Sequence, residues 1–143
     1  MPKVFTSEKQ KIGKIGENVA VKFLVKHGFL ILDKNYTKKW GELDIVAERK
    51  NKLHFIEVKS VTKNLNTVIL YPKIDEKIQG IDTWRAEDNM HPWKLKRMSR
   101  TIQTYLLFKK IPDEKEWEAD LLVVYLDLKS KKAKVKVVED IIL

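Results

Sequence analysis

Three charged side chains, Asp44, Glu57 and Lys59, lie within two apolar stretches of the chain. Both stretches are rich in Ile, Val, Leu and Phe, and a polar cluster at 48–52 separates them, which predicts two β-strands joined by a turn. Successive side chains of a strand point to opposite faces, so Glu57 and Lys59 share a face with Phe55. If the two strands pair as a hairpin, Asp44 lies beside Glu57. Two carboxylates and one ammonium then converge on one patch of the sheet.

This convergence has two interpretations. Charges in or beside a core must be paired or bind a metal, and one lysine offsets only part of the repulsion between two acids. A divalent cation would offset the rest, and oxygen ligands suit Mg²⁺ or Mn²⁺. The alternative is a structural ion pair on a half-buried sheet, because Glu-x-Lys is a common tripeptide. The spacing alone leaves both interpretations open.

The composition predicts a single domain that spans residues 1–143. A chain of 143 residues with 43% hydrophobic residues can bury a core without covalent staples. The lack of cysteine excludes disulfides and thiolate zinc sites. The N-terminal residues lack the apolar core of a signal peptide, and the run Leu121–Leu126 is far too short to cross a bilayer. We therefore expect a cytoplasmic protein with no membrane partner.

The charge balance points to an anionic partner. Lys and Arg number 29 against 20 Asp and Glu, which gives a formal net charge of +9. Such a balance favours nucleic acid first and acidic membrane surfaces second. The alternative is a lysine-rich soluble surface that has no partner.

Helical periodicity predicts a first helix from the N-cap Ser7 to about Lys26, with Gly28 just past its end. Gly16 weakens this helix but allows a close approach to the sheet. Glu17, beside it, either faces solvent or leans toward the acidic patch. A strand that begins at Phe29 precedes the two strands around Asp44 and Glu57, which predicts a three-stranded antiparallel meander.

The segment at about 62–92 gives no clear pattern beyond a short strand at 67–71. A segment of this length without firm structure is unusual in a compact domain unless it has a function. We interpret it as an insertion, which either forms a flap over a substrate or has no role.

A second helix is predicted to open at Pro92, which suits a first helical turn. Its apolar face contains Leu95, Met98, Ile102, Tyr105 and Leu106. Its basic residues are Lys94, Lys96, Arg97, Arg100, Lys109 and Lys110, with no acid among them. A helix that is apolar on one side and only positive on the other suits a polyanion backbone, and a plain solvated face is the alternative.

Two more strands complete the predicted fold. The strand predicted at 120–126 is continuously apolar after Asp120, as in a central strand, and residues 133–138 alternate lysine with valine, as in an edge strand. The sequence therefore predicts an α/β fold with a central mixed sheet of about five strands flanked by helices.

Other reaction classes fit this sequence poorly. It has no cysteine nucleophile, no Gly-rich phosphate loop and no G-x-S-x-G elbow. His27, His54 and His91 lack the spacing of metal ligands, and we interpret each as a surface or core residue. Trp84 and Trp93 are interpreted as packing residues, with base stacking as the alternative.

Several short motifs follow one another along the chain in an order that is typical of one protein family. The first helix carries Gly16-Glu17-x-x-Ala20, and the next strands carry Gly41-Glu42-Leu43-Asp44 and Phe55-Ile56-Glu57-Val58-Lys59. Lys94-x-x-Arg97, Tyr105-Leu106 and Asp120 follow. In this combination the chain resembles the YraN-like family of predicted bacterial nucleases, which is similar to the PD-(D/E)XK nuclease superfamily with its Holliday-junction resolvases. The resemblance spans about residues 13–126, apart from 62–92, and implies a restriction-endonuclease-like core.

The resemblance also implies a role for each matching residue. Asp44, Glu57 and the backbone carbonyl of Val58 would hold the cation, and Lys59 would orient or help deprotonate the attacking water. Glu17 would complete the acidic cluster. Lys94 and Arg97 would contact phosphates, and the basic face of the second helix adds Arg100.

Two positions depart from the pattern of that family. Val61 stands where an arginine is frequent, and Glu118-Ala119 replace an Arg-Phe pair before Asp120. These changes bear on substrate contact more than on metal binding.

The leading hypothesis is a Mg²⁺- or Mn²⁺-dependent DNA endonuclease that hydrolyses phosphodiester bonds, with branched or otherwise structured DNA as the candidate substrate. A homodimer would help it to cut two strands together. The alternatives are a non-catalytic nucleic-acid-binding module, such as a subunit of a DNA repair or uptake assembly, and a lysine-rich scaffold for proteins.

Overall fold

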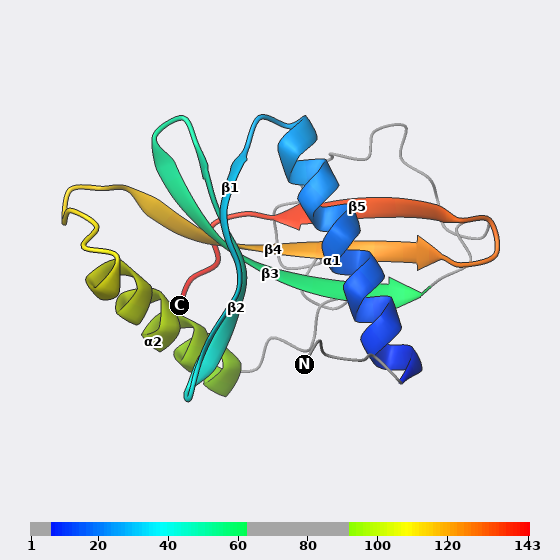
Figure 1. The fold of residues 1–143 in the computed structure, drawn as a ribbon, viewed down its shortest axis with the longest axis horizontal. Helices are drawn as coiled ribbons and strands as arrows, with labels where there is room; N and C mark the ends of the chain where they lie inside the picture. Colours follow the sequence, from blue (N-terminus) through cyan, green and yellow to red (C-terminus); the bar gives the residue numbers. More distant parts are fainter. Residues whose placement is uncertain (1–6, 63–91) are drawn as a thin grey trace, which may run out of the picture.

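The computed structural model describes residues 7–62 and 92–143, which form seven elements (Figure 1). The predicted insertion and the short strand at 67–71 lie outside the described residues. Along the chain the elements are α1 (Glu8–Lys26), β1 (Leu30–Lys38), β2 (Gly41–Arg49), β3 (Lys52–Thr62), α2 (Pro92–Phe108), β4 (Trp117–Asp127) and β5 (Lys132–Val138).

The ends of α1 match the prediction from the sequence. Ser7 is the N-cap, and its hydroxyl accepts the backbone N–H of Gln10 at 3.1 Å, while the Gln10 side chain bonds back to Ser7. This reciprocal pair satisfies two of the backbone donors that every helix leaves open at its start. Gly28 follows the last turn with φ +86°, a left-handed conformation that glycine adopts without a Cβ penalty.

The five strands form one mixed sheet in the order β1-β2-β3-β4-β5. The predicted antiparallel meander of β1, β2 and β3 is confirmed. The chain then crosses over through α2, so that β4 pairs parallel to β3, and β5 returns antiparallel to β4 as an edge strand. β4 begins at Trp117, earlier than the predicted Asp120, because its parallel pairing with β3 starts at Leu53 opposite Trp117.

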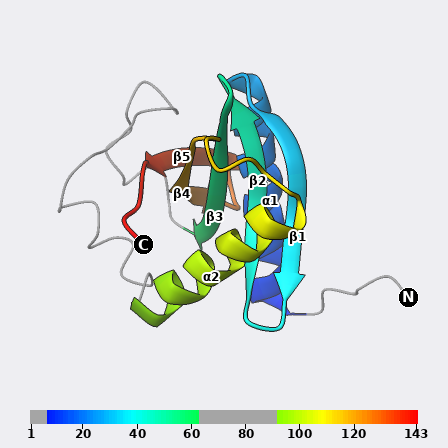
Figure 2. The ribbon, with the colours of Figure 1, turned by 90° about the vertical axis from the view of Figure 1, so that its left-hand side faces the viewer.

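One helix covers each face of the sheet, and Figure 2 shows α1 and α2 on opposite sides of it. Ala20 and Leu24 of α1 pack with Ile45, Ile56 and other residues of one face. The apolar side of α2 packs on the other face. This second core includes Leu43, Phe55, Met98, Ile102, Tyr105, Leu121 and Val123. The continuous apolar character of β4 follows from this arrangement, since both faces of β4 are covered.

Glycine allows close contacts where each helix meets the sheet. A Cβ on Gly16 would overlap the Ser60 hydroxyl and lie 2.8 Å from the Ser60 Cβ, so α1 can seat against β3 only because residue 16 is glycine. A Cβ on Gly41 would lie 2.5 Å from Thr101 Oγ1 and 3.3 Å from the Arg97 carbonyl oxygen, which brings the start of β2 against α2. Both contacts lie close in sequence to the charged residues described next.

Candidate active site

Asp44 and Glu57 lie where β2 and β3 stop pairing regularly. The antiparallel register runs from Arg49 opposite Lys52 to Ile45 opposite Ile56, and its continuation places Asp44 opposite Glu57. At this point the Asp44 carboxylate accepts the backbone N–H of Val58 at 2.8 Å. The Asp44 side chain thus accepts a backbone N–H of β3 that a neighbouring strand could otherwise accept within the sheet. The two carboxylates that the sequence placed on adjacent strands are neighbours in the structure.

The surroundings of Asp44 disfavour its charged form. The pKa of Asp44 is raised to about 8, chiefly by desolvation of the carboxyl and secondly by the nearby charge of Glu57, against a lowering by the Val58 N–H. The charges of Glu42 and Glu17 also raise this pKa. At neutral pH the metal-free protein therefore favours the protonated form of Asp44, and a cation bound beside it would favour the carboxylate.

Glu17 of α1 belongs to the same acidic neighbourhood. Its carboxylate accepts a hydrogen bond from the side-chain amide of Asn35 at 3.0 Å. Asn35 lies on β1 between the pairs Lys34–Ile45 and Tyr36–Leu43, at the level of Asp44, and its φ of +54° is left-handed. Asparagine tolerates this conformation better than most residues. The turned backbone at Asn35 thus ties α1 to the β1–β2 pair beside Asp44.

The predicted basic residues lie on β3 and α2. Lys59 is half-buried two residues after Glu57, on the face of β3 that α2 covers. Lys94 was predicted to contact phosphate, and in the structure its ammonium lies 2.9 Å from a Glu57 carboxylate oxygen. Arg97 donates its Nε–H to the Trp40 carbonyl oxygen at 2.8 Å, and Arg100 is exposed on the same helix. The start of α2 therefore brings positive charge to the edge of the acidic group.

The packing interpretation of Trp93 is wrong. This residue is 57% exposed at the start of α2, although the guanidinium of Arg97 lies 5.6 Å from the centre of its ring. Trp84 lies outside the described residues.

A second polar group, which the sequence did not reveal, lies inside the sheet. His54 Nδ1 is 2.8 Å from Asp120 Oδ2 and 3.7 Å from Glu118 Oε2, and all three side chains are buried or nearly so. Lys52 bonds the other Glu118 oxygen at 2.7 Å, and the Asp140 backbone N–H bonds Asp120 at 3.0 Å. Burial, followed by a hydrogen bond with Asp120, raises the pKa of Glu118.

The donor atoms of His54, Glu118 and Asp120 lie within 4.8 Å of one another, so this group could hold a metal ion. Within 7–62 and 92–143, the acids around Asp44 form no three-donor group as compact as this one. The sequence signal that could have revealed this group is the pair of acids at 118 and 120, which lie two residues apart at the start of an apolar strand. The missing information was the register, which places His54 opposite Glu118 and so next to both acids.

The comparisons with known proteins identify the family. The sequence pattern described as "Uncharacterised protein family UPF0102" matches residues 16–127. The chain belongs to this family. The match confirms the YraN-like resemblance, and the matched range includes every candidate residue named above.

Two Campylobacter proteins are similar over most of their length. The UPF0102 protein of Campylobacter fetus is 34% identical over 109 residues, which cover 76% of this chain and 79% of that protein. The UPF0102 protein of Campylobacter hominis is 30% identical over 131 residues, covering 92% of this chain and 93% of that protein. A UPF0102 protein of Bacteroides thetaiotaomicron is 38% identical over 82 residues, covering 54% of this chain and 68% of that protein.

Among solved structures, Pyrococcus furiosus SfsA in complex with Ca²⁺ aligns with a TM-score of 0.34 and 14% identity. The alignment covers 94% of this chain and 73% of SfsA.

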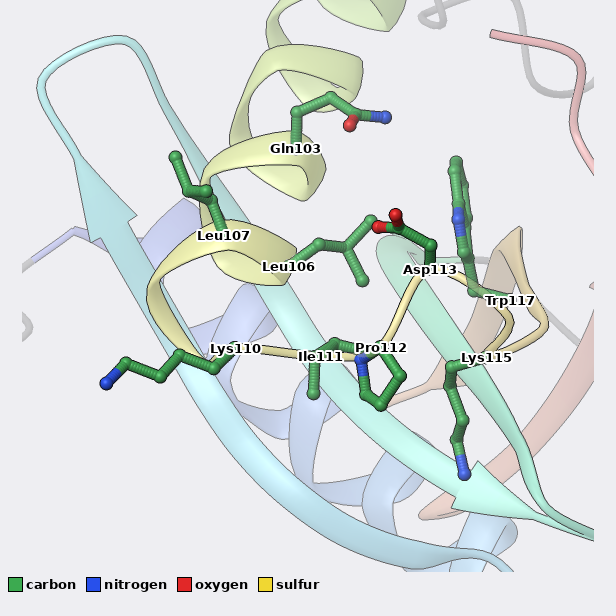
Figure 3. Close-up of a pocket in the computed structure, with 9 residues that line it drawn as sticks. All are labelled: Gln103, Leu106, Leu107, Lys110, Ile111, Pro112, Asp113, Lys115 and Trp117. Carbon is green, nitrogen blue, oxygen red and sulfur yellow. The ribbon is translucent and has the colours of Figure 1, made fainter.

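The UPF0102 chain also has a surface hollow of about 540 Å³ at the far end of α2 (Figure 3). Leu106 points into it toward Asp113 and Trp117, whereas Lys110 points away. None of the candidate acids or lysines around Asp44 lines this hollow. In the part of the chain that the structure describes, neither helix has the length and apolar character needed to cross a membrane.

Proposed function

We propose that this UPF0102 protein is a divalent-metal-dependent endonuclease that hydrolyses phosphodiester bonds in DNA, with branched or otherwise structured DNA as its substrate. One observation carries the proposal. Asp44 is half-buried beside Glu57 in a setting that raises its pKa to about 8, Lys94 lies 2.9 Å from Glu57, and Lys59 follows Glu57 by two residues on β3. This combination of acids and bases suits a site that binds a cation and a phosphate together.

The residues present fit Mg²⁺ or Mn²⁺. Carboxylate oxygens of Asp44 and Glu57, with the Val58 carbonyl as a third candidate, are the hard donors that these ions prefer. A bound ion would supply a Lewis acid for the non-bridging phosphate oxygen and would lower the pKa of a water. It would also offset the repulsion between the ionised forms of Asp44 and Glu57, which Lys94 and the Val58 N–H oppose in part.

The basic residues have separate tasks in this proposal. Lys59 holds and orients the attacking water and offsets negative charge that develops on the phosphate. Lys94 pairs with Glu57 in the metal-free protein, and in this proposal its ammonium turns to the incoming phosphate once a cation neutralises Glu57. Glu17, held by Asn35, adds negative charge at the rim of the cation site. Arg97 and Arg100 extend the positive surface along α2 for the neighbouring phosphates.

The test is a cleavage assay with wild-type protein on a four-way DNA junction, a single strand and a linear duplex, each with Mg²⁺, Mn²⁺ or EDTA. We expect metal-dependent cutting of the junction, and a loss of about a hundredfold or more in Asp44→Asn, which weakens the cation site, and in Lys59→Met, which no longer orients the attacking water. Asp113→Asn removes an exposed acid far from the site and should cut like the wild type.

Two outcomes would reject the nuclease assignment. One is wild-type protein that cuts none of the three substrates with either metal. The other is Asp44→Asn that cuts as fast as the wild type. If the protein binds these DNAs without cutting them, the non-catalytic binding module takes the place of the enzyme.

A further inference from the structure

The start of α2 presents an exposed aromatic ring next to the acidic group. Trp93 is the second residue of the helix and is 57% exposed. The next residue, Lys94, lies 2.9 Å from Glu57. A large indole costs free energy when it is left in water, and its neighbours on α2 are Lys94, which contacts Glu57 of the candidate cation site, and Arg97. Its position, rather than its exposure alone, therefore needs an explanation.

Arg97 supports one side of this ring. It follows Trp93 by four residues, so the two side chains are neighbours on the helix surface, with the guanidinium 5.6 Å from the ring centre. Arg97 also donates its Nε–H to the Trp40 carbonyl oxygen at 2.8 Å, which restrains the guanidinium. The indole thus has a cationic neighbour, and with 57% of the residue exposed it keeps ring surface that a ligand can reach.

The helix continues this feature as a basic stripe. Positions 93, 97, 100 and 104 follow the three- and four-residue spacing of one helix side. The buried residues of α2 are Met98, Thr101, Ile102 and Tyr105, which lie on the other side. Trp93, Arg97 and Arg100 therefore line up along the exposed side of α2, with the aromatic ring at the end nearest Glu57.

We propose that Trp93 stacks on an unpaired nucleobase at the cleavage position, while Arg97 and Arg100 follow the phosphates of the same strand. Aromatic rings beside a positive groove bind single-stranded nucleic acid in this way, because every base has a face to stack and every nucleotide has a phosphate to neutralise. A fully paired duplex offers no free base to the ring. The substrate class is therefore DNA with an unpaired nucleotide at the cut site, and the location of that cut rests on the proposed function.

Binding in EDTA tests the stacking without any cleavage. The probes are a fluorescently labelled thymidine oligonucleotide, an oligonucleotide of equal length whose residues are all abasic, and a blunt duplex, each followed by anisotropy. We expect Trp93→Ala to weaken binding of the thymidine strand about tenfold or more, and to leave binding of the abasic strand and the duplex within about twofold of the wild type. Trp93→Phe keeps a ring and should restore most of the loss.

The matched control is Leu107→Ala, which removes another exposed apolar side chain, 74% exposed, from the far end of the same helix. It should bind all three probes like the wild type. The proposal is overturned if Trp93→Ala binds the thymidine strand normally, if it loses affinity for all three probes equally, or if wild-type protein binds the thymidine and abasic strands alike. These results are independent of cleavage, so an inactive enzyme that still prefers the thymidine strand would reject the nuclease assignment and leave the stacking site intact.

Discussion

Asp44 has the most strongly perturbed carboxyl group around the candidate cation site. Its folded-state pKa of about 8 is far above the ordinary value of 3.8, chiefly because the carboxyl is desolvated and secondly because Glu57 lies beside it. Between these two values the folded protein holds a proton that the unfolded chain has lost. The stabilising contribution of that proton is complete below about pH 3.8 and is lost as the pH rises through about 8.

The first prediction follows from this difference. In EDTA, raising the pH from about 5 to about 8 should lower the free energy of unfolding of the wild type by about 1–3 kcal/mol more than that of Asp44→Asn, which cannot titrate there. Urea unfolding at several pH values measures both proteins. Adding Mn²⁺ at the upper pH should restore stability to the wild type and not to the variant. Equal pH slopes for the two proteins would show that Asp44 is already compensated without a cation.

At the scale of the element, the seating of α1 on β3 depends on a missing side chain. A Cβ on Gly16 would overlap the Ser60 hydroxyl, whereas a Cβ on Gly13 would meet nothing within 4 Å. Gly13→Ala should therefore stabilise the protein by up to about 1 kcal/mol through helix propensity. Gly16→Ala should destabilise it by about 1–3 kcal/mol through overpacking, despite the same gain in propensity.

A second substitution separates overpacking from other causes. In Gly16→Ala/Ser60→Gly, the nearest remaining atom would be the backbone Cα of residue 60 at 3.7 Å, an ordinary contact. Ser60→Gly should change the free energy of unfolding more favourably in the Gly16→Ala background than in the wild type. Thermal unfolding of the four proteins of the double-mutant cycle measures this difference. Additive effects would mean that helix and strand move apart at little cost.

The elements also show where sequence reasoning works. The N-cap Ser7, the helix-ending Gly28 and the antiparallel meander each follow from local rules on a few adjacent residues, and all three were predicted. Asp44 and Glu57 could be paired because a short hairpin sets their register. His54 and Glu118 could not be paired, since their contact depends on the register of a parallel crossover, which no local pattern specifies. The exposure of Trp93 likewise depends on how α2 is rotated over the sheet.

At the scale of the whole molecule, a net charge of +9 would attract any polyanion, so affinity for DNA alone says little about where DNA binds. The structure allows attraction by net charge to be separated from local phosphate contacts, because α2 and α1 lie on opposite faces of the sheet (Figure 2). Arg100 is exposed on α2 and Lys22 is exposed on α1. Replacing either by glutamate changes the net charge by nearly the same amount.

If DNA lies along α2, the two variants must differ. Arg100→Glu removes a phosphate contact, so it should lower affinity about tenfold and reduce the slope of log K against log salt concentration by about 1. Lys22→Glu changes only the long-range field, which salt screens within about 8 Å at physiological ionic strength, so its affinity should stay within about threefold and its slope should not change. Titrations of labelled DNA at several salt concentrations give both quantities. Equal losses of affinity in the two variants would mean that net charge alone attracts the DNA. The bound strand would then not lie along α2 beside the acidic site.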